Sequence, residues 1–338
     1  MLESSDRPLV DAYDLVMFDL DGVVYIGDDA IAGAPEHLAR VRASGVHVAY
    51  VTNNASRSPA AVAAKLTGLG VDAQASDVVT SAQASAHLLL EQHGEGARVA
   101  QLGGPGLHDA LAEAGLQPVA VDDAAVALAT GFGPDVVWHE VMTAAMRIRD
   151  GLPWVASNTD LTLPAPDGSA PGHGALVRLL SEFAGVEPEV AGKPAPPLLE
   201  ETIRRVGGDR PLMVGDRLDT DIEGGRRVGV DSLLVLTGVT GIADLVTAGP
   251  ELRPTYVSSD LGGLLEAHQA PAHENDTWTA GGWTARVNDG RLTVDGDSDS
   301  GRDDWWRAAM AAAWGHLDAT GKPVDTAGLV PPRAASER

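Results

Sequence analysis

Two aspartates, Asp19 and Asp21, stand two residues apart at the end of an apolar run that spans residues 15–20, and Gly22 follows them. In an extended backbone their carboxylates would point to the same side. Neighbouring carboxylates repel each other, so they need a cation to stay ionised together, and Mg²⁺ prefers oxygen ligands. Aspartate can also act as a nucleophile through an aspartyl-phosphate. In isolation, however, these residues are more typical of an ordinary polar turn after a strand.

Three further clusters could take part in the same chemistry. Thr52-Asn53-Asn54 offers a hydroxyl and amide donors to phosphate oxygens, and Lys193 offers a compact positive charge. The segment 215–221 contains three aspartates, which is unfavourable unless they are solvated or bind a metal. Each cluster alone also fits a simpler interpretation, namely turn residues for Thr-Asn-Asn and a surface charge for the lysine.

The elements around these clusters predict one α/β domain. Residues 15–20, 46–51 and 212–214 are short apolar runs whose length and composition favour buried strands. Helical patterns cover residues 34–44, before Gly45, and residues 59–68, after an N-cap at Ser58. This alternation is typical of a parallel sheet, and open sheets of this kind bind ligands at the carboxyl ends of their strands. The clusters therefore predict one phosphoryl-transfer site. In chain order they would provide the nucleophile, the donors to the phosphate oxygens, the lysine and the metal-binding carboxylates.

The middle of the chain predicts an insertion into this domain. Its Pro- and Gly-rich residues 163–173 predict a loop. Before this loop, strand patterns cover residues 98–102, 118–121, 125–129 and 152–157. In the main domain, a further strand pattern covers residues 232–236.

Beyond about residue 269 the composition changes, since five of the seven tryptophans lie there. Residues 283–287 and 291–294, joined by Asn288-Asp289-Gly290, predict a β-hairpin. Residues 303–316 predict a helix, and the last 20 or so residues predict a loose end. Because tryptophans need burial, this part predicts a small folded module.

The composition of the 338 residues excludes several classes of protein. A formal charge of −24 argues against nucleic-acid binding and against docking on an anionic membrane. The chain contains no cysteine, which removes disulfides, thiolate catalysis and cysteine-based metal sites. The start of the chain has no leader pattern and no apolar run approaches the length of a membrane span, so a cytoplasmic enzyme is expected.

The four clusters resemble those of the haloacid dehalogenase-like hydrolases, and specifically the NagD-type phosphatases, which carry an α/β cap. The matching stretches are FDLDGVVYIGDDAIAGAPE, VAYVTNNASRS, AGKPAPPLLE and LMVGDRLDTDIEGGRRVGVDSLLVLTGV. The resemblance implies a Rossmann-like α/β core with a parallel sheet at residues 1–94 and 187–268, an inserted α/β cap at 95–186, and a small α+β module at 269–338. That module resembles part of an acetyltransferase-like fold found on actinobacterial glycerol-3-phosphate phosphatases of this group.

The same resemblance implies roles for individual residues. Asp19 would be the nucleophile, and Asp21 would be the general acid and base. Thr52, Asn53 and Asn54 would contact the phosphoryl group. Lys193 would neutralise its charge. Mg²⁺ would be held by the Asp19 carboxylate, the Asp21 carbonyl and Asp216, with support from Asp221.

The cap departs from the family pattern at several positions. His173 replaces the usual asparagine of a Pro-Gly-Asn-Gly stretch, and Trp138 replaces a common tyrosine. Gly131-Phe132-Gly133 stands where the family has a glycine, a hydrophobic residue and an aspartate. A histidine in a predicted loop is more often a surface residue than a catalytic one, so we assign no chemistry to His173.

Glycerol 3-phosphate is the first expected substrate because the C-terminal module resembles that of the glycerol-3-phosphate phosphatases. Pyridoxal phosphate, phosphoglycolate and sugar or nucleotide monophosphates are the alternatives. Two other functions stay open: a regulatory protein that binds a ligand without turnover, and a bifunctional enzyme whose C-terminal module binds an acyl carrier. The sequence offers no glycine-rich loop for coenzyme A, which argues against the second. The expected partner is a small phosphorylated metabolite, and the family's cap-mediated dimers make a homodimer one option.

Overall fold

The computed structural model describes residues 1–165, 168–296 and 301–331. The chain divides into two compact units, one formed by residues 1–47 and 208–338 and the other by residues 48–207. The domain boundaries expected after residues 94, 186 and 268 stay predictions.

The first unit contains four parallel strands in the order β15-β14-β13-β1. They are β1 (Leu15–Phe18), β13 (Pro211–Gly215), β14 (Asp231–Val235) and β15 (Tyr256–Ser258). All four residues of β1 are fully buried, as expected for a parallel strand that is covered on both faces. The predicted parallel α/β architecture is confirmed.

Helix α1 (Leu9–Ala12) precedes β1, and α2 (Ala34–Ala43) follows it. A π-helical turn at Leu218–Ile222 and α9 (Glu223–Arg227) connect β13 to β14, and α10 (Ile242–Val246) lies between β14 and β15. After β1, the small hairpin of β2 (Tyr25–Ile26) and β3 (Asp29–Ala30) leads into α2.

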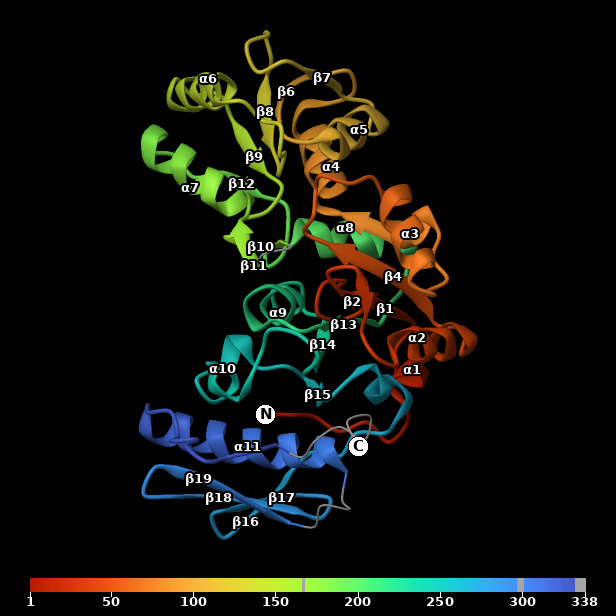
Figure 1. Cartoon of the computed structure of the whole chain (residues 1–338), viewed down its shortest axis with the longest axis vertical. Helices are drawn as coiled ribbons and strands as arrows, with labels where there is room; N and C mark the ends of the chain where they lie inside the picture. The colour runs from red at the N-terminus through yellow and green to blue at the C-terminus, as the bar shows by residue number, and fades with distance from the viewer. Residues whose placement is uncertain (166–167, 297–300, 332–338) are drawn as a thin grey trace. The chain divides into compact units, whose positions relative to one another are not determined.

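The C-terminal part of this unit is an antiparallel sheet covered by one long helix (Figure 1). The elements are β16 (Ala272–Glu274), β17 (Thr277–Ala280), β18 (Trp283–Asn288), β19 (Arg291–Gly296) and α11 (Arg302–Thr320). The predicted hairpin forms, and its turn residues Asp289 and Gly290 both have positive φ, as a two-residue type I′ turn requires. The predicted helix is also present, with ends beyond those expected.

The tryptophans of this module are not packed in a core of their own. Trp305, Trp306 and Trp314 belong to the same buried cluster as Leu234 of β14 and Val257 of β15. The α+β module and the parallel sheet therefore share one hydrophobic core.

The second unit holds two groups of parallel strands. One is the pair β4 (His47–Thr52) and β5 (Val78–Thr80). The other is a five-stranded sheet, whose order is β12-β9-β8-β6-β7. Its strands are β6 (Arg98–Leu102), β7 (Gln117–Val119), β8 (Ala127–Thr130), β9 (Trp154–Ala156) and β12 (Glu189–Val190).

In the described part of this unit α-helices accompany these strands, and α6 and α7 cover one face of the five-stranded sheet while α4 and α5 cover the other (Figure 1). They are α3 (Pro59–Gly68), α4 (Ser81–His93), α5 (Pro105–Glu113), α6 (Trp138–Arg149), α7 (His173–Ala184) and α8 (Pro197–Val206).

The loop predicted at residues 163–173 is wrong. The described part of this segment forms a hairpin of β10 (Thr162–Ala165) and β11 (Gly168–Pro171), and His173 begins α7. Residues 166–167 lie outside the described residues. A two-stranded ribbon has only edge strands, and edge strands accept proline, so the Pro-rich composition did not exclude a strand here.

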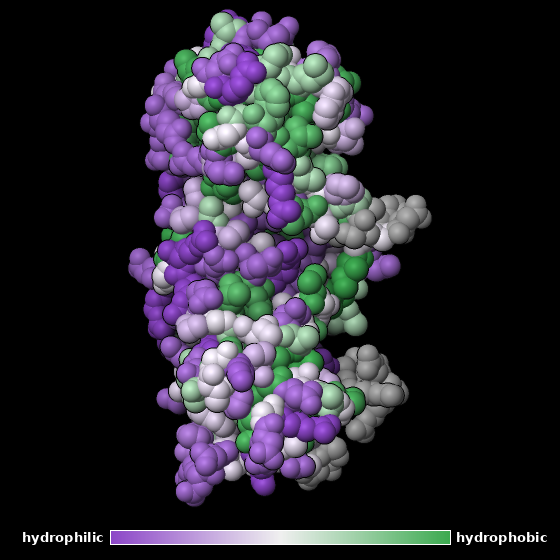
Figure 2. Space-filling model, turned by 90° about the vertical axis from the view of Figure 1, so that its left-hand side faces the viewer, coloured by the Kyte–Doolittle hydropathy of each residue, from purple (hydrophilic) through white to green (hydrophobic). Residues whose placement is uncertain are grey.

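No helix among the described residues is long and apolar enough to cross a membrane. The face drawn in Figure 2 carries hydrophilic side chains over most of its area, with smaller apolar areas between them.

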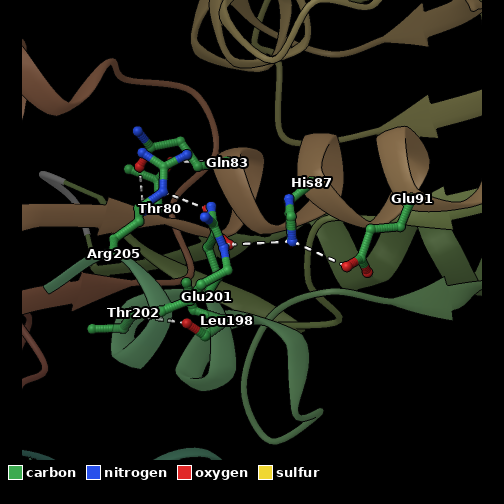
Figure 3. Close-up of polar contacts among 9 residues, drawn as sticks. Thr80, Gln83, His87, Glu91, Leu198, Glu201, Thr202 and Arg205 are labelled. Carbon is green, nitrogen blue, oxygen red and sulfur yellow. Dashed lines mark hydrogen bonds and ion pairs between the residues drawn. The ribbon is translucent and has the colours of Figure 1, made fainter. Parts of the chain in front are cut away.

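A buried carboxylate joins helices α4 and α8 (Figure 3). Glu201 of α8 is 2% exposed and accepts hydrogen bonds from Arg204 and Arg205. His87 of α4 lies 3.8 Å from Glu201 and 3.3 Å from Glu91. Burial alone would raise the pKa of Glu201, but the two arginines outweigh it and hold the pKa below its ordinary value.

Replacing this carboxylate tests its contribution to stability. Glu201→Gln should lower the free energy of unfolding at pH 7 by about 1–3 kcal/mol, because hydrogen bonds to a charged partner are lost. A group with a lowered pKa stabilises the fold above its ordinary pKa and loses this effect as it becomes protonated, so the difference should shrink as the pH falls through the lowered value. Urea unfolding at pH 7 and at several pH values from 4.5 downwards measures both effects. Exposed Glu200→Gln is the matched control, and equal behaviour of the two variants would contradict the assignment.

Candidate active site

Two of the predicted metal ligands, Asp19 and Asp216, lie together in the first unit with Asp221, for which a supporting role was expected. Asp19 directly follows β1, Asp216 directly follows β13, and Asp221 lies in the π-helical turn. One carboxylate oxygen from each lies within 4.8 Å of the others. Asp216 and Asp221 are fully buried, so their charges are costly without compensation.

The backbone around Asp216 approaches its carboxylate very closely. Val239 N–H donates to Asp216 Oδ2 at 2.7 Å, and Thr240 N–H donates to the Asp216 carbonyl at 3.3 Å. A Cβ atom at Gly238 would collide with the same carboxylate, and so would one at Gly22. Both positions therefore have to be glycine for the surrounding chain to close around Asp216.

The side chains of Asp219 and Asp221 differ in exposure, although the two residues are only two positions apart. Asp221 Oδ2 accepts from Arg217 N–H at 3.1 Å, and a Cβ at Gly215 would collide with the Asp221 side chain. Asp219 points outward, where it forms an ion pair with the Arg217 guanidinium at 2.8 Å. Of the three aspartates in this segment, Asp219 is thus exposed and paired with an arginine, and the other two are buried.

This set of donors fits a magnesium ion. Magnesium prefers hard oxygen ligands and is usually held by one or two carboxylates, with other positions left to water and substrate. Asp19, Asp216 and Asp221 would supply the carboxylates, and a bound dication would offset the repulsion among them.

Asp21 lies outside this carboxylate cluster and is exposed. The chain does not stay extended beyond Asp19, because the Leu20 carbonyl accepts from the N–H groups of Val23, Val24 and Tyr25 in a tight turn. Strict alternation along a strand therefore does not hold for the pair Asp19 and Asp21, and the turn itself sets the direction of Asp21.

In the second unit, the Asn53 side chain is bonded to the main chain of Lys193. Lys193 N–H donates to Asn53 Oδ1 at 2.8 Å, and Asn53 Nδ2 donates to the Lys193 carbonyl at 3.0 Å. The same Nδ2 donates to Asp160 Oδ1 at 3.2 Å. These contacts engage both ends of the amide. The expected phosphate contact of Asn53 stays a prediction, but its side chain holds the lysine backbone.

Two more side chains fix the main chain of Asn53. Asn158 Nδ2 and Ser81 Oγ both donate to the Asn53 carbonyl, at 2.7 and 2.6 Å. Asn158 Oδ1 in turn accepts from Asp160 N–H at 3.2 Å. Lys193 itself is only 2% exposed. The network therefore joins the ends of β4 and β9 to the lysine.

The other two residues of the Thr-Asn-Asn motif differ in their surroundings. The Thr52 hydroxyl is buried and accepts from Asn54 N–H at 3.1 Å, which leaves its own proton to donate elsewhere. Asn54 is exposed, and its Oδ1 accepts from the N–H and hydroxyl of Ser56. Asn54 thus stabilises the turn after β4.

Sequence reasoning missed two parts of these sites. It did not identify Asn158 and Asp160, whose side chains bond to Asn53 and so contribute to the network around Lys193. It also missed the segment 237–241, whose backbone holds Asp216. The signal for that segment was present, since Leu-Thr-Gly-Val follows an apolar strand and contains the glycine that close approach requires.

The surface position expected for His173 is wrong. The side chain is 3% exposed, and Nδ1 lies 2.9 Å from the Asn158 carbonyl, so Nδ1 carries the proton. Nε2 is buried, and it has no hydrogen-bond partner among the described residues. Burial lowers the pKa of His173 to about 4, despite the opposing hydrogen bond to Asn158. The residue was misjudged because its segment was taken for a loop.

The Asn53 contact can be tested on the lysine backbone. The chain contains only three lysines, Lys65, Lys193 and Lys322, so [¹⁵N]lysine labelling gives three backbone amide signals. Asn53→Ala removes the acceptor, and amide hydrogen exchange at Lys193 should accelerate about tenfold. Exchange at the other two lysines should not change. Asn54→Ala is the neighbouring control, and unchanged exchange at Lys193 in Asn53→Ala would refute the contact.

The buried neutral histidine predicts a pH effect on stability. Between about pH 6.5 and 4 the unfolded chain binds a proton at residue 173 that the folded protein does not, so stability falls as the pH drops. From pH 7 to pH 5 this amounts to about 2 kcal/mol. His173→Asn should remove that part of the loss, as measured by urea unfolding at both values. Exposed His139→Asn should behave like wild type, and an unchanged loss in His173→Asn would contradict the burial.

The sequence matches two family models. Residues 16–117 match the haloacid dehalogenase-like hydrolases, and residues 190–264 match a second model described as HAD-hydrolase-like. The first match contains Asp19 and the Thr-Asn-Asn motif, and the second contains Lys193 and Asp216.

Individual relatives agree with these models. The D-glycerol 3-phosphate phosphatase of Mycobacterium tuberculosis is 42% identical over 294 residues, which cover 87% of this chain and 81% of that protein. The acid sugar phosphatase of Staphylococcus aureus is 37% identical over 74% of this chain and 95% of its own length.

Solved structures extend the similarity to the fold. The glycerol phosphate phosphatase of M. tuberculosis in complex with magnesium has a TM-score of 0.84 at 40% identity, with 94% of both chains covered. The 4-nitrophenylphosphatase of Thermotoga maritima has a TM-score of 0.70 at 30% identity and covers 76% of this chain and 98% of its own. With its motifs, fold and relatives in agreement, the chain belongs to the haloacid dehalogenase-like hydrolases.

Proposed function

We propose that this protein is a magnesium-dependent phosphatase that hydrolyses glycerol 3-phosphate to glycerol and phosphate. The observation that carries the proposal is the convergence of Asp19, Asp216 and Asp221, of which the last two are fully buried. A structural role alone does not account for carboxylates brought together at such cost, whereas a divalent cation does.

In the first half of the reaction, an Asp19 oxygen attacks phosphorus and the bond to the ester oxygen breaks. Asp21 donates its proton to the departing alkoxide, so that glycerol leaves as a neutral alcohol. The exposed position of Asp21 in the turn after β1 suits a group that exchanges protons with solvent between turnovers. Asp19, Asp216 and Asp221 would hold magnesium, which would supply positive charge to stabilise the phosphoryl oxygens and to orient Asp19.

In the second half, Asp21 takes a proton from water, and the hydroxide formed attacks the aspartyl-phosphate. Phosphate leaves and the Asp19 carboxylate is restored. By the family pattern, the Lys193 ammonium and the Thr52 hydroxyl bind the phosphoryl oxygens. Asn53 acts by holding Lys193, which is supported by its hydrogen bonds to the lysine main chain.

The choice of glycerol 3-phosphate rests on the M. tuberculosis relative, whose name states that substrate. The structural match to the M. tuberculosis glycerol phosphate phosphatase covers 94% of this chain, which must include much of the C-terminal module. Sugar phosphates are the second candidate, since the S. aureus relative is an acid sugar phosphatase. Pyridoxal phosphate, phosphoglycolate and nucleotide monophosphates complete the panel of substrates to test.

We expect a homodimer through the cap because large apolar side chains are exposed along α6 and α7, among them Trp138 at 64% and Phe183 at 54%. The cytoplasm and the absence of nucleic-acid partners stay predictions from the composition.

Phosphate release from a panel of esters with Mg²⁺ tests the function. The specificity constant should be largest for glycerol 3-phosphate, and Asp19→Asn should lower it by at least about a thousandfold because the nucleophile is lost. Asp219→Asn is the matched control, since that aspartate is exposed and paired with Arg217. Equal release by wild type and Asp19→Asn would refute the nucleophile. Tight ligand binding without any release by wild type would instead favour a regulatory protein.

A further inference from the structure

The segment Thr237 to Gly241 holds two parts of the proposed metal site. It connects β14 to α10. Its Val239 and Thr240 N–H groups donate to Asp216, and the Thr237 hydroxyl donates to the Gly22 carbonyl at 2.6 Å. Gly22 follows Asp21 directly, so this one segment contacts both the turn after the nucleophile and the buried Asp216.

The segment is anchored at its far end by α10, which has only five residues. So short a helix is not stable by itself, so its position depends on contacts from other elements. The Leu245 carbonyl accepts from Ala248 N–H at 3.1 Å and also from the indole N–H of Trp314 of α11 at 2.8 Å, which links α10 to the C-terminal module. Trp314 is fully buried.

A second contact fixes the same tryptophan. The Arg253 guanidinium lies 5.2 Å above the Trp314 ring and donates to both carboxylate oxygens of Asp318, at 2.8 and 2.7 Å. Arg253 Nε also donates to the Ala248 carbonyl, just after α10. The arginine therefore joins the chain after α10 to α11, next to the tryptophan.

We propose that Trp314 is a positioning residue for the metal site and that the C-terminal module serves as a brace for the segment that holds Asp216. The contacts run from α11 to Leu245, along α10 to Thr240 and Val239, and from there to the Asp216 carboxylate. This inference rests on the proposed function, because it assumes that Asp19, Asp216 and Asp221 bind magnesium.

The brace predicts weaker metal binding when one indole N–H is removed. Groups that directly support a metal ligand typically contribute about 10- to 100-fold in affinity, and Trp314 acts through one further element. In the full-length protein, Trp314→Phe should therefore raise the Kd for Mg²⁺ about three- to tenfold, measured by calorimetric titration with Mg²⁺ alone. At saturating Mg²⁺, the KM for glycerol 3-phosphate should stay within about twofold of wild type.

Two other variants separate positioning from general loss of stability. Trp305→Phe alters a buried tryptophan of the same helix and the same core, and it should leave the Kd for Mg²⁺ within about twofold. Asp318 is half-exposed and forms an ion pair with Arg253. Asp318→Asn weakens this ion pair and should raise the Kd for Mg²⁺ about two- to threefold. It serves as the test if Trp314→Phe does not fold.

The outcomes are distinct. An unchanged Kd for Mg²⁺ in both Trp314→Phe and Asp318→Asn would refute the proposal that the C-terminal module braces the metal site. An equal increase of this Kd in Trp314→Phe and Trp305→Phe would refute it as well. Absence of Mg²⁺ binding by the wild-type protein would overturn the proposed function itself. Normal binding by wild type with no response in the variants would overturn the brace alone.

Discussion

The first unit depends on keeping like charges together where water is excluded. Asp216 and Asp221 are fully buried and reach Asp19 within 4.8 Å, and mutual repulsion opposes this arrangement. Backbone N–H groups offset part of it, those of Val239 and Arg217 most directly. Such contacts require the chain to approach closer than a side chain would permit, which explains why glycine stands at positions 22, 215 and 238. The sheet, the π-helical turn and the segment after β14 are arranged around this requirement.

Much of the framework could be predicted because it follows from local patterns. Short apolar runs gave the parallel strands, Ser58-Pro59 gave the start of α3, and Asn288-Asp289-Gly290 gave the hairpin turn. The grouping of Asp19 with Asp216 and Asp221 was also foreseeable, because strand ends of a parallel sheet meet at one edge. In each case the information lies within a few neighbouring residues or in a general rule of topology.

The rest depended on contacts between residues far apart in the chain. Asn53 and Lys193 are 140 residues apart, and so nothing in Thr-Asn-Asn reveals that the amide binds the lysine main chain. Burial of His173 follows from the hairpin before it and from Asn158, neither of which composition could place. The tryptophans at 305, 306 and 314 predicted a buried cluster, but they did not predict which elements it would pack against. Only the structure shows that they share a core with β14 and β15.

The way Asn53 holds residue 193 has a consequence for how this site can change during evolution. Both hydrogen bonds go to the main-chain N–H and carbonyl, and neither involves the ammonium group. The backbone position of residue 193 therefore does not depend on the identity of its side chain. If a mutation replaced the lysine by another cationic residue, the same two hydrogen bonds would still hold its backbone. Sites fixed in this way can explore new chemistry without first losing their geometry.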